Sequence, residues 1–338
     1  MDLIYRQMLL RIFKGTGPGV IFLIIVTLIA VWISAILNQR LHPRFIYETD
    51  PMPLYGLMKI LIHNSHNLGV ILSFLMASVM AFLMVNFNTT VFFINERTFL
   101  PGLLYVLFGG FFPDHQLLNP VLPASIFLML AIKRIMDGYH KTGTAYNYFD
   151  AGILISTGSL FYANLIWFGL LVIIGIALLR TGNLKEIVIS ILGLLTPYLI
   201  TFSLYYVIGK DIGALMKLLG DNLFVRSTYY PFQRLTILAL IFSGSLVLFS
   251  IIQLTNYMNT KKIKARKTFS LMIWTFLISI IVYIALPSAS VEIVWLVSIP
   301  VSYFLTHYFV VVKKKLVPEI LFSLLFLFIL LIQIWHLR

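Results

Sequence analysis

The sequence has no cysteine in its 338 residues, and it is poor in charged side chains. The missing cysteines exclude disulfide bonds, thiolate metal sites and lipid attachment through cysteine. Asp, Glu, Lys and Arg make up 11% of the residues, whereas roughly a quarter is usual in a soluble domain. Apolar residues take their place, since 60% of the chain is hydrophobic and the mean hydropathy is +0.97. This composition predicts a polytopic membrane protein without a large soluble domain.

Acidic residues are scarcer than basic ones, with 12 Asp and Glu against 25 Lys and Arg and a formal net charge of +13. The Lys and Arg residues come in short clusters between apolar runs. This is the distribution that the positive-inside rule describes for membrane proteins. The basic balance therefore indicates orientation in the membrane and contact with lipids, and we expect no nucleic acid as a partner.

Apolar runs occupy almost the whole chain. About 20 residues cross a bilayer as a helix, so the runs predict one membrane domain over residues 1–338. The expected fold is an all-α bundle of about 11 transmembrane helices. The predicted spans are 18–38, 69–94, 99–112, 119–134, 150–163, 164–180, 186–209, 234–257, 268–286, 291–312 and 316–336.

The stretch 150–180 decides which basic clusters share one side of the membrane. If it is one tilted helix, the clusters at 261–267 and 313–315 lie on the outer side. If it is two short helices joined near Asn164, both clusters lie in the cytoplasm. The positive-inside rule favours two helices. It thereby predicts a multi-pass membrane protein with a cytoplasmic N-terminus and the C-terminus on the outer side.

Three segments outside the spans have amphipathic character. Residues 1–15 are basic and lack a small-residue cleavage site, so they predict a cytoplasmic interfacial helix and not a cleaved signal. Residues 39–68 and 210–233 form the long outer, periplasmic loops, and each contains a stretch that predicts an interfacial helix. Both loops carry more Lys and Arg than orientation requires. This excess suggests an anionic ligand such as a lipid phosphate, with general attraction to anionic headgroups as the alternative.

Motifs of the common soluble enzymes are absent. The chain has no G-x-x-x-x-G-K-[ST], no H-E-x-x-H and no G-x-S-x-G. His63 and His66 share one face of a helix, but no third ligand stands next to them. We therefore predict no metal site from this pair.

Most carboxylates stand at predicted helix ends. Asp150 and Glu292 each open a predicted helix, where an acidic side chain caps exposed backbone N–H groups. Glu48 and Asp50 differ, because the run Asp-Pro-Met-Pro begins at Asp50 and its prolines forbid an ordinary helix interior. These two carboxylates are expected in an extended or turn segment at the outer surface.

The segment DPMPLYG, from Asp50 to Gly56, follows a first span and leads into an apolar juxtamembrane helix. A second segment, AGILISTGSLFYANL, contains Gly152, Gly158 and Leu160. Together they resemble the glycosyltransferase C superfamily, whose members depend on polyprenyl-phosphate sugars. The whole chain, with NPVLPASIFLMLAIKRI, LGLLTPYLI and SIPVSYFLTHYFVVVKKK, is similar to an uncharacterised Bacteroidetes-type family of inner-membrane proteins.

The resemblance implies a glycosyltransferase C-like fold and transfer of a sugar from a polyprenyl-phosphate donor at the periplasmic face. Asp50 would be the general base that takes a proton from the acceptor hydroxyl. Glu48 would assist a divalent metal ion or orient the acceptor. Arg226, Arg234 and Lys210 would hold the lipid phosphate, where cations stabilise the charge of the leaving group.

Two other functions stay open. Thr49 separates the two carboxylates, whereas active members of the superfamily usually carry a neighbouring acidic pair. A relative that kept the fold and lost the chemistry would be a non-catalytic scaffold or lipid-binding subunit. Its partners would be proteins of a secretion, translocation or motility complex in the bacterial envelope. Short helices such as 99–112 would also suit a secondary transporter, although no inverted repeat is visible.

Overall fold

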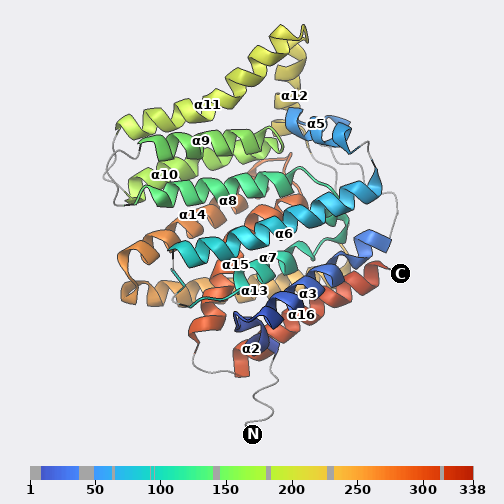
Figure 1. Ribbon diagram of the computed structural model, residues 1–338, viewed down its shortest axis with the longest axis vertical. Helices are drawn as coiled ribbons and strands as arrows, with labels where there is room; N and C mark the ends of the chain where they lie inside the picture. The colour runs from blue at the N-terminus through green and yellow to red at the C-terminus, as the bar shows by residue number, and fades with distance from the viewer. Residues whose placement is uncertain are drawn as a thin grey trace.

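The protein is a bundle of helices in the computed structural model (Figure 1). The structure describes residues 9–37, 49–62, 65–91, 93–94, 96–139, 145–179, 184–226, 232–312 and 316–337, and no strand occurs among them. The helices, with η for 3-10 helices, are α2 (Leu9–Lys14), α3 (Pro18–Leu37), α5 (Pro53–Leu61), α6 (His66–Val91), α7 (Leu100–Gly109), η1 (Pro113–Gln116), α8 (Val121–Asp137), α9 (Ala145–Ser159), η2 (Ala163–Phe168), α10 (Gly169–Leu179), α11 (Leu184–Val207), α12 (Ile212–Phe224), α13 (Arg234–Tyr257), η3 (Met258–Thr260), α14 (Ile263–Ala285), η4 (Val291–Ile293), α15 (Val294–Val311) and α16 (Leu316–His336). The predicted all-α class is confirmed.

Seven helical segments in the described part of the chain are long and apolar enough to cross a membrane. Each has at least 18 residues, which is close to the 20 or so that span the hydrocarbon core. They are α3, α6, α11, α13 with η3, α14, α15 with η4, and α16. The chain is therefore a helical membrane protein. The prediction of eleven spans requires that the shorter helices cross as well, and this stays a prediction.

The shorter helices α7 to α10 lie against the long ones (Figure 1). The chain breaks after α9, where Tyr162 has an extended backbone, and continues through η2 into α10. Residues 150–180 therefore form two helical pieces, as the distribution of basic residues predicted. A short helix at membrane depth is tolerated where protein, and not lipid, surrounds it.

Two helices, α7 and α15, form the centre of the bundle. All ten residues of α7 are buried, and 83% of the membrane-length window of α15 is buried. The two helices meet at Gly109, where a Cβ atom would lie 2.1 Å from the ring of Trp295. On its other side α7 approaches α6 closely, since a Cβ at Gly102 would lie 2.7 Å from the carbonyl oxygen of Ala81. Neither contact leaves room for a larger residue.

Helix α11 lies at one edge of the bundle and packs on α9 (Figure 1). Only 17% of its membrane-length window is buried. Glycines on both helices permit close approach: a Cβ at Gly152 would lie 2.6 Å from the Ser190 oxygen, and one at Gly193 would lie 2.3 Å from the Phe149 oxygen. Small residues at membrane helix interfaces act in this way, because van der Waals packing is the main attraction available there.

The N-terminal segment contains a short helix that packs on the bundle, and its position at the membrane interface stays a prediction. Within residues 1–15, α2 is described, and its Leu10 and Phe13 are buried. The backbone N–H of Leu10 donates to the Glu319 carboxylate over 2.9 Å, and the ring of Phe13 lies 6.0 Å from that of Phe322. Helix α2 is therefore packed on the beginning of α16, because its apolar face finds protein there.

The predicted capping role of Asp150 is wrong. Helix α9 begins at Ala145, five residues earlier, so Asp150 lies inside the helix. Its carboxylate is 3.5 Å from the guanidinium of Arg134 on α8. Asp150 therefore pairs with a residue of the neighbouring helix and does not cap the start of its own.

Candidate functional site

The segment that begins at Asp50 is fixed to two other parts of the chain. Pro53 stands at the start of α5, where a missing N–H costs nothing and the fixed φ suits the first turn. The carbonyl oxygen of Asp50 accepts a hydrogen bond from Nδ2 of Asn222 on α12, over 2.9 Å. The N–H of Leu54 donates to the carbonyl of Leu160, over 3.1 Å. We call this meeting of residues 50–58, α12 and the turn at 160–163 the α5–α12 junction.

Helix α12 reaches the junction through a defined turn. Gly209, with a φ of 73°, reverses the chain after α11, a conformation that favours glycine. Asp211 then caps α12, since its carboxylate accepts from the N–H of Gly213 over 2.8 Å. The helix runs to Phe224, and Arg226 lies two residues further along the chain. The helices predicted within residues 39–68 and 210–233 are both present, as α5 and α12.

An apolar cluster holds the junction together. Met52, Tyr55 and Met58 of the first segment are buried against Ala163, and Leu219 and Leu223 of α12 pack on the same cluster. In addition, the Tyr55 hydroxyl donates to the carbonyl of Leu118 over 3.1 Å. These contacts turn the apolar face of α5 toward the bundle.

Three of the predicted site residues lie near the two ends of α12. The backbone carbonyl of Asp50 is bound by Asn222, and Arg226 follows Asn222 by four residues, just past the end of α12; the side chains of Asp50 and Arg226 are both exposed. Lys210 is exposed before the start of α12, with its ammonium group 5.3 Å from the ring centre of Tyr205. The 13 residues of α12 span about 20 Å, so Lys210 lies a helix length away from Arg226.

The remaining two predicted site residues are Arg234 and Glu48. Arg234 is the exposed first residue of α13. Glu48 lies outside the described residues. No group of three or more His, Cys, Asp or Glu side chains that could hold a metal ion occurs among the residues that the structure describes. We therefore derive no step through the divalent metal ion that the resemblance implied.

A buried polar cluster lies directly beneath the junction. Glu292 is 1% exposed, and its Oε1 accepts from the N–H of Ser290 over 3.0 Å and from the Tyr162 hydroxyl over 3.4 Å. Asn164 donates to the Ser288 hydroxyl over 3.0 Å. The same Ser288 hydroxyl donates to the carbonyl of Leu223 on α12, over 2.7 Å. The cluster thus links η2, the segment before α15, and α12.

Sequence reasoning assigned Glu292 only to capping and missed this cluster. The Glu292 carboxylate does accept from a backbone N–H close to the start of α15, but it is enclosed in the protein. Its second oxygen, Oε2, makes no hydrogen bond within the described part of the chain. A signal was present in the sequence, because Glu292 is the only charged residue between Lys267 and Lys313. Carboxylates this isolated in apolar sequence tend to be buried and functional.

The exposed side chains of Asp50 and Arg226 each have a chemistry suited to work on phosphate compounds. An exposed carboxylate can accept a proton from a hydroxyl group, and an exposed guanidinium can bind two phosphate oxygens in parallel. The underlying polar cluster fixes the end of α12 and therefore the position from which Arg226 projects.

A model of a family of unknown function (DUF6427) matches residues 52–338. The chain belongs to this family. No curated protein and no solved structure matches it. In this DUF6427 protein the matched region contains α5, α12 and the Glu292 cluster, and it begins two residues after Asp50.

Proposed function

We propose that this DUF6427 protein is a glycosyltransferase C-like enzyme of the bacterial inner membrane. It would transfer a sugar from a polyprenyl-phosphate donor at the periplasmic face, with the N-terminus in the cytoplasm. The observation that carries the proposal is the hydrogen bond from Asn222 to the Asp50 carbonyl. It supports a shared site because it joins the acidic first outer segment to the helix that leads to Arg226.

In the proposed reaction, Asp50 accepts the proton of an acceptor hydroxyl. The acceptor oxygen forms a bond to the anomeric carbon of the sugar, and the bond from that carbon to the phosphate oxygen breaks. The polyprenyl phosphate leaves with the bonding electron pair. Arg226 stabilises the charge that develops on this phosphate, and Arg234, the first residue of α13, gives a second contact to it. Lys210 attracts the anionic donor to the same membrane face from a greater distance.

A test of catalysis follows from the fate of the unused donor. Cells that lack the protein should accumulate a polyprenyl-phosphate sugar, which mass spectrometry of lipid extracts detects whichever sugar the donor carries. Asp50→Asn should behave like the deletion, because loss of a general base lowers a rate by about 100-fold or more. Asp211→Asn is the matched control, since Asn caps a helix as well as Asp. The absence of any accumulated donor in the deletion strain would reject the enzyme.

The second candidate is a non-catalytic lipid-binding subunit of an envelope complex. The observation that favours it is the exposure of the Asp50 side chain, because a catalytic base usually works in a site that excludes water. In this case Arg226→Gln would weaken retention of polyprenyl phosphate by the purified protein, while Asp50→Asn would change neither retention nor donor levels. Partner proteins would co-purify at a fixed stoichiometry. A pure monomer after gentle extraction argues against this candidate.

A further inference from the structure

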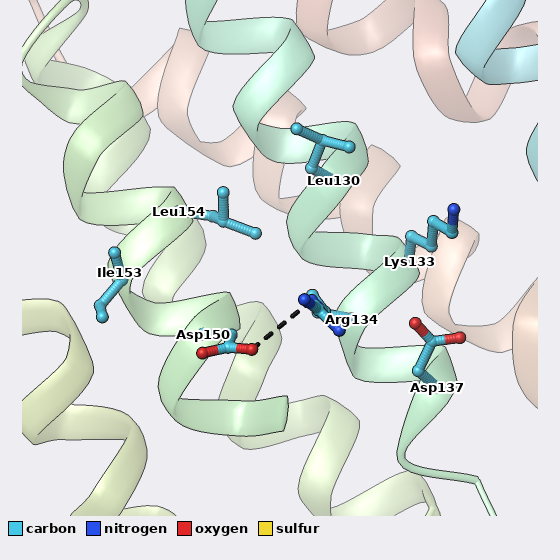
Figure 2. Close-up of a pocket in the computed structure, with 7 residues that line it drawn as sticks. All are labelled: Leu130, Lys133, Arg134, Asp137, Asp150, Ile153 and Leu154. Carbon is cyan, nitrogen blue, oxygen red and sulfur yellow. Dashed lines mark ion pairs between the residues drawn. The ribbon is translucent and has the colours of Figure 1, made fainter. Parts of the chain in front are cut away.

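A pocket of about 510 Å³ opens between α8 and α9, remote from the α5–α12 junction. Its lining includes Lys133, Arg134, Asp137 and Asp150 (Figure 2). Along α9, ten residues separate Asp150 from Leu160 at the junction, which corresponds to about 15 Å of helix. We call this the α8–α9 pocket. Its volume lies within the range of small-ligand sites.

The charges in the α8–α9 pocket balance, with two cations and two carboxylates. Arg134 and Asp150 face each other across the gap between the two helices (Figure 2). Lys133 and Asp137 stand four residues apart on α8. Within the described part of the chain, no ion pair satisfies either of them at 4.0 Å or less. The pocket therefore offers a cation and a carboxylate beyond the one pair already formed.

The existing ion pair is open to exchange. Its nitrogen–oxygen distance is 3.5 Å, and the two side chains are 49% and 40% exposed. Strong charge-assisted hydrogen bonds are shorter, at about 2.7–2.9 Å, and exposed pairs of this kind are weak. A ligand that carries both charges can thus replace the contact between Arg134 and Asp150 with contacts of its own.

The wall of the pocket becomes apolar one helical turn away from the charges. Leu130 precedes Arg134 by four residues on α8, and Leu154 follows Asp150 by four residues on α9. Ile153 adds a third apolar side chain. Residues four apart lie on one face of a helix, so each charged residue has an apolar neighbour on the same face. This combination fits an amphipathic ligand at a membrane boundary.

We propose that the α8–α9 pocket binds the headgroup of a zwitterionic phospholipid with a primary ammonium group, namely phosphatidylethanolamine. The phosphate would contact Lys133 and Arg134, and the ammonium group would donate to Asp137 and Asp150. The apolar side chains would contact the glycerol and the start of the acyl chains. By the positive-inside rule this end of α8 faces the cytoplasm, so the lipid would come from the inner leaflet.

The charge pattern distinguishes this lipid from two common alternatives. An anionic headgroup such as phosphatidylglycerol would leave both carboxylates without a cation from the ligand. A choline headgroup has the right charges, but its methyl groups remove every N–H donor that a carboxylate could accept. A ligand that matches all four side chains carries an anionic group for the two cations and an ammonium group with N–H donors for the two carboxylates, and phosphatidylethanolamine has both.

Lipid retention by the full-length protein tests the proposal. The purified protein is mixed with equal amounts of phosphatidylethanolamine, phosphatidylglycerol and phosphatidylcholine, and bound lipid is counted by native mass spectrometry. We expect the wild type to prefer phosphatidylethanolamine. Asp137→Asn with Asp150→Asn should lower this preference about tenfold, and Lys133→Gln should lower retention of all three lipids. Asp211→Asn and Lys262→Gln, which change exposed charges elsewhere, should leave it unchanged.

Several outcomes would overturn the proposal. One is equal retention of the three lipids by the wild-type protein, a measurement that depends on no variant being folded. Another is an unchanged preference in a double variant that elutes and melts like the wild type. Soluble phosphoethanolamine is added in a separate arm. If the protein binds it but retains no phosphatidylethanolamine, the pocket takes a soluble compound and the lipid assignment is wrong.

Discussion

Among single residues, Glu292 has the surroundings least expected of a carboxylate. It is enclosed in the protein, and one of its oxygens accepts hydrogen bonds from Ser290 and Tyr162. Burial of a polar group is tolerated when such bonds are present and costly when one partner is removed. The role of Glu292 is therefore to hold the segment before α15 against the turn at Tyr162.

Two substitutions of Glu292 should distinguish the stabilising effect of its hydrogen bonds from any effect of its negative charge. Glu292→Ala leaves the Ser290 N–H and the Tyr162 hydroxyl without their acceptor, and each such loss costs about 1–3 kcal/mol. Glu292→Gln keeps an oxygen for these donors and should cost less. Apparent melting temperatures in detergent compare the variants. If Gln destabilises the protein as much as Ala, the negative charge itself is required and this explanation fails.

At the scale of elements, the α9–α11 contact depends on glycine. Backbone atoms, which cannot rotate away, would lie against a Cβ at Gly152 or Gly193. Gly193→Ala should therefore lower the apparent melting temperature, as overpacking typically costs about 1–3 kcal/mol. Gly244→Ala in α13 is the matched control, because a Cβ there meets no atom within 4 Å. That variant should be neutral or slightly stabilising, since Ala is the better helix former. Equal effects of both substitutions would contradict tight packing of α9 on α11.

At the scale of the whole molecule, the absence of cysteine makes the topology directly measurable. A single cysteine at exposed Lys217 in α12 should react with a membrane-impermeant maleimide in intact spheroplasts. One at exposed Lys262 before α14 should react only after permeabilisation. Leu117→Cys, between α7 and α8, should also react from outside if the short helices cross the membrane. Because Leu117 is partly buried, only protection in intact spheroplasts followed by reaction after permeabilisation would mean that α7 and α8 return to the side from which they entered.

Much of the fold could be predicted because it depends on local properties of the sequence. The apolar runs predict the long helices, and the proline-led amphipathic stretch after Asp50 predicts α5. The break near Tyr162 follows from the placement of basic residues around it. The pairing of Asp150 with Arg134 could not be predicted in this way, because Arg134 is on another helix.

The candidate site was only partly accessible from sequence. The number of spans between them predicts that the segments of Asp50 and Arg226 share one side of the membrane. The bond from Asn222 to the Asp50 carbonyl could not be predicted, because it joins residues 172 positions apart. The hydrogen bond between Tyr162 and Glu292 could not be predicted for the same reason, since the two residues are 130 positions apart. Pairings over such separations depend on the packing of the whole bundle.

The shortness of α7 has a consequence for how the protein is made. Ten residues measure about 15 Å, half of the hydrocarbon thickness, so the insertion machinery cannot release this segment into lipid as an independent helix. During synthesis, α6 emerges first with the surface around Ala81 uncovered. Helix α7 then packs on this surface through Gly102. Helix α15, which completes the enclosure at Gly109, is translated almost 200 residues later. Biogenesis must therefore protect a half-built core for most of the time that the ribosome needs to finish the chain.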